Sequence, residues 1–144
     1  IKHDGHGNGT IGGVALDECN RLAVGVSTGG IRGKMPGRVG DTPIPGAGFW
    51  ASRLIASCST GYGEAIIMAQ PCRLLSTLFE GFGLPLREAV KSSCEVVKGS
   101  CGIIALTVNG EMAATASADA MPIAIARKGK IDVKVIVRGE VVEL

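Results

Sequence analysis

The stretch of residues 29–48 constrains the fold most, because its glycines and prolines exclude regular secondary structure. Prolines follow Met35, Thr42 and Ile44, and glycines recur through the rest of the stretch. Long ordered loops inside compact domains usually carry a function. Glycine lets the backbone approach a ligand closely, and glycines of this chain lie among hydroxyl-bearing residues. We therefore expect one long functional loop in the first third of the chain.

Regular elements are predicted on both sides of this loop. Before it, residues 10–16 and 22–27 have the composition of two paired strands with a turn at residues 18–20. After it, the pattern predicts a strand within residues 49–59 and a buried helix over residues 64–79 that is kinked or broken at Pro71. An amphipathic helix is predicted over residues 86–97. The last predicted strands cover residues 102–108, 111–116, 123–126 and 131–137. This order of strands, helices and strands predicts an α+β domain. Several strands are apolar on both sides, so we expect a sheet covered on both faces.

Composition narrows the class of protein. The 144 residues suffice for one domain, and 46% hydrophobic but only 3% aromatic residues predict an aliphatic core. The net charge of +2 comes from scattered residues, which favours neither a nucleic-acid partner nor a membrane surface. No apolar stretch approaches the roughly 20 residues of a membrane span, and the first residues lack signal-peptide character. We expect a cytoplasmic protein.

Neither cysteine chemistry nor a cofactor is predicted. The five cysteines form no Cys-x-x-Cys pair, which favours reduced, packed thiols. A catalytic cysteine needs an activating histidine, and the two histidines, His3 and His6, both precede the first predicted strand. Residues 7–12 match a dinucleotide-binding spacing, but that motif follows a strand and this one precedes it. His3, Asp4 and His6 are interpreted as solvated residues, and we expect no metal.

Thr10 opens the first predicted strand and has two interpretations. A β-branched residue is ordinary in a strand. If the Gly9–Thr10 bond were cut, however, Thr10 would be an N-terminal nucleophile with its own α-amine, of reference pKa about 8, as the base. No histidine or acidic residue at a suitable spacing offers another base. Pairing of the first two strands would place Thr10 beside Thr28.

Two further pairs of residues have a functional and a structural interpretation. Arg38 and Asp41 fit the α-carboxylate and α-ammonium groups of an amino acid, or they form a salt bridge that only orders the loop. Thr60 and Gly61 can donate a hydroxyl and a backbone N–H to an oxyanion, or they begin a helix with Glu64 in its first turn. The residues alone leave both alternatives open.

Taken together, these blocks resemble the β-subunit of the plant-type L-asparaginases and isoaspartyl peptidases, which are Ntn-hydrolases. The resemblance rests on the Gly-rich segment of residues 7–17, on Ser27-Thr28-Gly29-Gly30, on residues 37–48 and on residues 59–64, and it weakens from there to Ala126. It implies an αββα sandwich in which this chain supplies one half. Residues 1–9 would then be the end of an α-subunit linker, and residues 10–144 the β-subunit. Residues 115–122 are loosely similar to a segment of the relatives and receive no role.

The resemblance also implies an activity and its residues. The precursor would cut itself between Gly9 and Thr10. The implied roles are Thr10 as the nucleophile, Thr28 as its support, Arg38 and Asp41 as anchors of the substrate α-groups, and Thr60 and Gly61 as the oxyanion hole. The enzyme would hydrolyse L-asparagine and β-aspartyl dipeptides without a cofactor. Its partner would be the α-subunit, in a dimer of αβ units.

Other activities stay open at this stage. Glycosylasparaginases share the block at residues 43–48, although Gly29 and Glu64 are more typical of the asparaginase branch. Asp41 argues against the threonine aspartases that cut proteins, which lack it. An inactive homologue that is never cleaved is the remaining alternative, because the nitrogen of an internal Thr10 is an amide without basicity.

Overall fold

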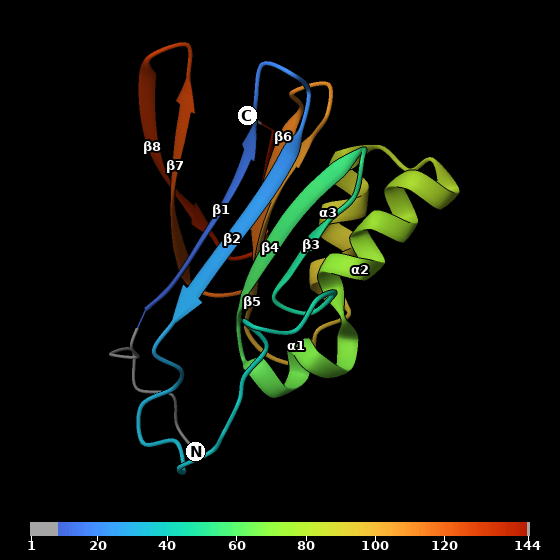
Figure 1. Ribbon diagram of the computed structural model, residues 1–144. Helices are drawn as coiled ribbons and strands as arrows, with labels where there is room; N and C mark the ends of the chain where they lie inside the picture. Colours follow the sequence, from blue (N-terminus) through green and yellow to red (C-terminus); the bar gives the residue numbers. More distant parts are fainter. Residues whose placement is uncertain (1–8, 144) are drawn as a thin grey trace.

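A computed structural model describes residues 9–143 (Figure 1). The first eight residues, which hold most of the expected linker and both histidines, lie outside this range. Strands β1 (Thr10–Leu16) and β2 (Leu22–Thr28) form an antiparallel hairpin whose register pairs Thr10 with Thr28. The predicted hairpin is confirmed, and β2 extends to Thr28 itself.

The remaining strands form two further antiparallel sheets. A five-stranded sheet has the order β3 (Phe49–Ala51), β4 (Ile55–Gly61), β5 (Cys101–Thr107), β6 (Met112–Ala116) and β9 (Val141–Glu143). A second hairpin joins β7 (Ala120–Arg127) to β8 (Lys130–Val137). The sequence pattern predicts one strand within residues 49–59 where the structure has two. It did not predict β9, which has only three residues.

The helical region is interrupted just before Pro71, as the sequence predicts. Helix α1 (Gly63–Ala69) ends at Gln70, whose φ of 48° is left-handed, and α2 (Pro71–Ser76) begins directly afterwards. Pro71 occupies the first turn of α2, where backbone N–H groups have no partner within the helix, so its missing N–H costs no hydrogen bond. A π-helical turn (Thr77–Gly81) and α3 (Leu86–Glu95) follow. The expected helix over residues 64–79 is therefore three short segments.

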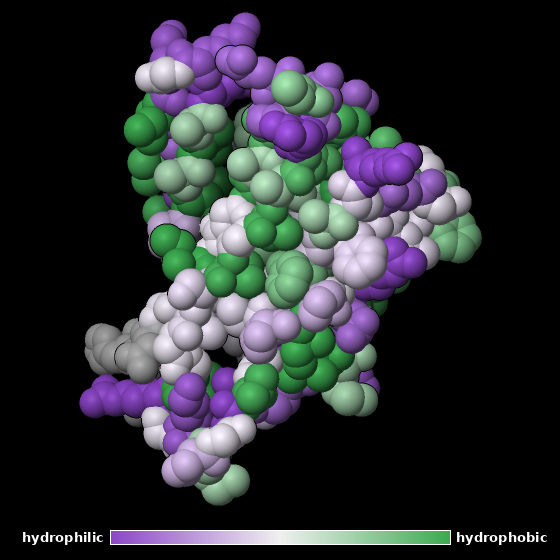
Figure 2. All heavy atoms as spheres, viewed as in Figure 1, coloured by the Kyte–Doolittle hydropathy of each residue, from purple (hydrophilic) through white to green (hydrophobic). Residues whose placement is uncertain are grey.

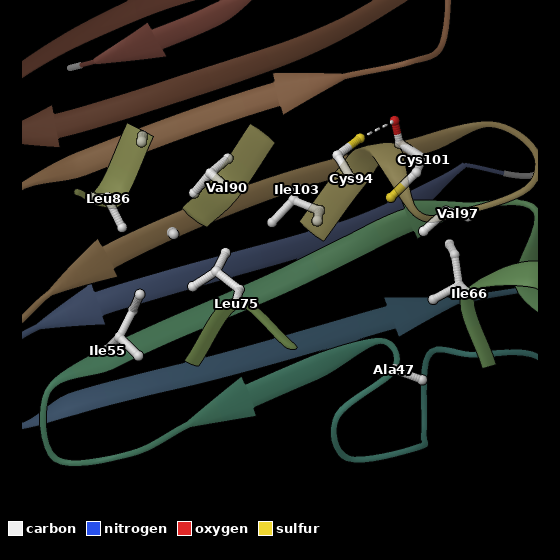
Figure 3. Close-up of a cluster of buried hydrophobic side chains, with 12 residues drawn as sticks. Ala47, Ile55, Ile66, Leu75, Leu86, Val90, Cys94, Val97, Cys101 and Ile103 are labelled. Carbon is white, nitrogen blue, oxygen red and sulfur yellow. Dashed lines mark hydrogen bonds between the residues drawn. The ribbon is translucent and has the colours of Figure 1, made fainter. Parts of the chain in front are cut away.

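The main core lies between the five-stranded sheet and the helices. Figure 3 shows Ile55 and Ile103 from the sheet facing Leu75 and Val90 from the helices, and all four side chains are fully buried. The β1–β2 hairpin lies against β4 on the other face of the sheet (Figure 1). The prediction of a sheet covered on both faces is thus confirmed at its centre. Within residues 9–143, no helix is long and apolar enough to cross a membrane.

The cysteines are free, and their burial predicts their reactivity. Cys19 is exposed, whereas Cys58, Cys72, Cys94 and Cys101 are buried. Burial raises the pKa of the Cys58 thiol to about 12 and that of Cys72 to about 11, so these two thiols stay protonated at neutral pH. A hydrogen bond with Cys101 lowers the pKa of Cys94, but its burial keeps a reagent away. We expect a thiol reagent to label only Cys19 of this chain in the native protein and all five thiols after denaturation. Mass mapping that finds Cys58 labelled as fast as Cys19 would contradict this.

Candidate active site

Thr10 and Thr28 meet at the open end of the first hairpin. Their hydroxyl oxygens are hydrogen-bonded at 3.1 Å, as the cross-strand register requires. The Thr28 hydroxyl also accepts the N–H of Gly30 at 3.0 Å, while the Lys34 ammonium donates to the Gly29 carbonyl at 2.9 Å. The start of the long loop therefore folds back to support Thr28. The expectation that these two threonines are neighbours is confirmed.

Thr10 and Thr60 line one cavity of about 830 Å³ between the first hairpin, the five-stranded sheet and β7. Cys58, Gly102 and Met121 contribute to its walls. This volume lies within the range of small-molecule sites in proteins. The residue at the start of β1 and the residue near the end of β4 thus border the same space.

Thr60 and Gly61 are the last two residues of β4, where they pair with Gly102 and Cys101. The interpretation of this pair as a helix start is wrong, because α1 begins at Gly63 with Tyr62 as its N-cap. Gly61 has a φ of 142°, and a Cβ there would collide with the Ser100 carbonyl. Only glycine fits such a position, so this segment is fixed closely against the neighbouring strand.

Arg38 forms its ion pair with Glu64, at the start of α1. The Nε of Arg38 donates to Glu64 Oε1 at 2.9 Å, and Nη2 lies 2.9 Å from the same oxygen. The sequence offered Asp41 as the salt-bridge partner of Arg38, whereas the partner in the structure is Glu64. The two residues are 26 positions apart, and neither spacing nor composition connects the loop to the helix. The structure supplies the connection by placing α1 beside the loop.

Asp41 and Arg38 lie together over Gly63. A Cβ on Gly63 would be 2.8 Å from Arg38 Nη2 and 2.8 Å from Asp41 Oδ1. Asp41 is only 7% exposed, and burial raises the pKa of its carboxyl group. Arg38 opposes this rise, whereas the negative charge of Glu64 adds to it. An ionised Asp41 is therefore a buried charge that gains from a cationic partner.

Two opposite charges in this group have unused hydrogen-bonding capacity. Four buried side-chain atoms of the described chain have no hydrogen-bond partner: Trp50 Nε1 and Ser57 Oγ elsewhere, and here Arg38 Nη2 and Asp41 Oδ2. Arg38 Nη2 lies 2.9 Å from Glu64 Oε1 as an ion pair but outside hydrogen-bond alignment. Buried polar atoms are normally satisfied, so such a pair suggests a ligand. A donor beside an acceptor matches the carboxylate and ammonium of an amino acid. Residues 9–143 contain no group of three or more His, Cys, Asp or Glu placed to hold a metal ion.

The ion pair with Glu64 makes a testable prediction for substrate affinity. Glu64→Ala frees the Arg38 guanidinium, and for an amino-acid substrate whose carboxylate binds there we expect KM to rise about tenfold with a smaller change in kcat. Glu64→Gln keeps an acceptor oxygen and should stay within about threefold of the unchanged enzyme. The exposed Asp17–Arg21 pair provides the control, and Asp17→Ala should leave KM unchanged. Equal KM values for all four proteins would contradict a role for Glu64.

Comparison with known proteins identifies the family of this chain. The family model described as Asparaginase matches residues 2–136, and the chain belongs to this family. The resemblance seen in the sequence is thereby confirmed.

Individual relatives are similar over most of this chain. The bovine isoaspartyl peptidase/L-asparaginase is 44% identical over 128 residues, covering 85% of this chain and 41% of that protein. The plant-type L-asparaginase of Pyrobaculum calidifontis is 38% identical, with 85% and 42% coverage. The Escherichia coli isoaspartyl peptidase is 42% identical over 110 residues, with 73% and 34% coverage. The chain thus spans about two fifths or less of the length of these relatives.

Proposed function

We propose that this chain is the β-subunit of an amidohydrolase that releases ammonia from L-asparagine and cleaves β-aspartyl dipeptides. The observation that carries the proposal is the 3.1 Å contact between the Thr10 and Thr28 hydroxyls at the start of β1. The names of the relatives, which are isoaspartyl peptidases and L-asparaginases, support it.

The chemistry begins when the Gly9–Thr10 bond is cut. The Thr10 hydroxyl attacks the Gly9 carbonyl, the acyl group moves from nitrogen to oxygen, and water hydrolyses the resulting ester. The freed α-amine then acts as the base for the same hydroxyl. In turnover, the Thr10 hydroxyl attacks the side-chain carbonyl of the substrate and forms a β-aspartyl ester. Ammonia, or the amino group of the second residue of a dipeptide, takes up a proton and leaves. Water then hydrolyses the ester and releases aspartate. Thr28 orients the attacking hydroxyl.

The substrate is held by the charged pair and polarised at the end of β4. Arg38 would bind the α-carboxylate and Asp41 the α-ammonium, which uses the two unpartnered buried atoms. Thr60 and Gly61 would stabilise the oxyanion that forms on the attacked carbonyl. Thr60 lines the cavity that Thr10 also lines, which supports this arrangement.

We propose that an α-subunit from the same precursor completes the αββα sandwich, with residues 10–144 as the β-subunit, in a cytoplasmic dimer of αβ units. Apolar side chains lie exposed along both hairpins: Ile11, Ile131, Val133, Val135 and Val137 are 53–76% exposed. Figure 2 shows hydrophobic residues at the surface over β7 and β8. Faces of this kind favour burial by a partner, and the chain spans less than half the length of its relatives.

The test is the intact mass of a precursor in which an α-half precedes this chain, followed during incubation together with hydrolysis assays. A cut between Gly9 and Thr10, with asparagine and β-aspartyl dipeptide hydrolysis appearing in parallel, is the expected result. A precursor that stays uncut and inactive would favour the inactive homologue. Preference for aspartyl-glucosamine over β-aspartyl dipeptides would favour a glycosylasparaginase.

A further inference from the structure

The ends of three neighbouring strands meet beneath the candidate oxyanion hole. The register places Gly61 of β4 opposite Cys101 of β5, and Gly102 of β5 opposite Ala116 of β6. Ser117 directly follows β6, and its N–H donates to the Cys101 carbonyl at 2.7 Å. Ser117 therefore lies beside Cys101 on the side away from Gly61.

The backbone of Gly61 and Tyr62 rests on the Ser100 carbonyl. The N–H of Tyr62 donates to this carbonyl at 2.8 Å. Gly61 approaches the same oxygen so closely that no side chain fits between them. The Ser100 carbonyl thus anchors the Gly61–Tyr62 backbone together with the pairing of Gly61 and Cys101.

The Ser117 hydroxyl fixes the backbone on both sides of Ser100. Its oxygen accepts the Cys101 N–H at 2.8 Å. The same oxygen lies 3.3 Å from the Gly99 carbonyl and 3.3 Å from the Cys101 carbonyl, and it can donate its proton to either. Gly99 and Ser100 are exposed and precede the first residue of β5; their other backbone hydrogen bonds run from the Gly99 N–H to the Val97 carbonyl at 2.9 Å and from the Tyr62 N–H to the Ser100 carbonyl.

We propose that Ser117 is a positioning residue for the oxyanion hole and acts through the Gly99–Cys101 backbone. The proposal rests on the proposed function of Thr60 and Gly61. Hydrogen bonds to a developing oxyanion stabilise the transition state more than the bound substrate, so a small displacement lowers kcat and leaves KM nearly unchanged.

Met121 lies near Gly102 in the wall of the cavity that Thr60 also lines. A Cβ built on Gly102, which pairs with Thr60, would collide with the Met121 sulfur. A Cβ built on Gly102 would also lie 3.5 Å from the Thr60 methyl group. Ser117 and Met121 thus place two residues of the segment 115–122, which the sequence left without a role, beside the end of β5.

The experiment compares variants of the complete, processed enzyme. For Ser117→Ala we expect kcat for L-asparagine to fall about tenfold with KM within about twofold. Ser117→Thr keeps the hydroxyl and should restore kcat to within about threefold. The matched control is Ser52→Ala: the Ser52 hydroxyl accepts the N–H groups of Leu54 and Ile55 and closes the turn at the opposite end of β4. That variant should retain kcat even where its melting temperature falls.

A second measurement does not depend on activity. We expect amide hydrogen exchange at residues 60–62 to be faster in Ser117→Ala than in Ser52→Ala or the unchanged protein. Unchanged exchange at residues 60–62, or equal losses of kcat in the two alanine variants, would overturn the positioning role. An unchanged protein that neither cuts itself nor hydrolyses asparagine would instead overturn the proposed function, and the exchange data would then decide only whether Ser117 holds the backbone of residues 60–62.

Discussion

Replacing Thr10 with alanine should leave the precursor uncut at Gly9–Thr10 and lower asparagine hydrolysis on the order of 10³-fold or more. The variant loses the hydroxyl that we propose as the nucleophile of both reactions, and an uncut chain also lacks the α-amine that we propose as the base. Thr10 is the first residue of β1, so the rest of the β1–β2 register is expected to persist. Intact mass and ammonia release measure the two effects.

Two further substitutions separate a catalytic Thr10 from a structural one. Valine is β-branched and close to threonine in size, so Thr10→Val keeps the strand preference and removes only the hydroxyl. Thr10→Ser keeps the hydroxyl and should retain partial cleavage and activity. If Thr10→Val were as active as the unchanged enzyme, Thr10 would be an ordinary strand residue and the nucleophile would lie elsewhere.

The local pattern of the sequence predicts the hairpins and the helix break because these depend on short-range chemistry. The pairing of Thr10 with Thr28 follows from two strands joined by a short turn, which fixes the register. The break before Pro71 follows from the missing N–H and fixed φ of proline. Each prediction needed only neighbours along the chain.

Contacts between distant segments could not be predicted in this way. The Arg38–Glu64 pair joins a loop to a helix, and the Ser117 hydroxyl reaches backbone 16 residues away. Arginines and serines have many equivalent partners in a sequence, and only packing selects one. Thr60-Gly61 was ambiguous for the same reason, because a hydroxyl followed by a glycine suits both a helix start and a strand end. Pairing with β5 resolves that ambiguity.

Replacing Asp41 with asparagine should lower kcat/KM for L-asparagine about 10²-fold, because in the proposed site the substrate ammonium loses its buried counter-charge. The same substitution should raise the melting temperature at neutral pH. Burial raises the pKa of Asp41 in the folded protein above its ordinary 3.8. The folded state therefore favours the protonated carboxyl, and the stability that Asp41 contributes at low pH is lost as pH rises through the raised pKa. Asparagine is neutral at every pH and avoids this cost.

The two effects of Asp41→Asn can be measured together across pH. The gain in melting temperature over the unchanged enzyme should be present at pH 7 and vanish below pH 3.8, where Asp41 is protonated in both the folded and the unfolded state. The exposed Asp132, paired with Lys134 at 3.9 Å, provides the control, and Asp132→Asn should change neither quantity. An Asp41→Asn enzyme that is less stable at pH 7 would mean that attraction to Arg38 outweighs desolvation. A fully active one would mean that the substrate ammonium binds elsewhere. Higher stability combined with lost activity is the result expected of a charge that is buried for binding rather than for folding.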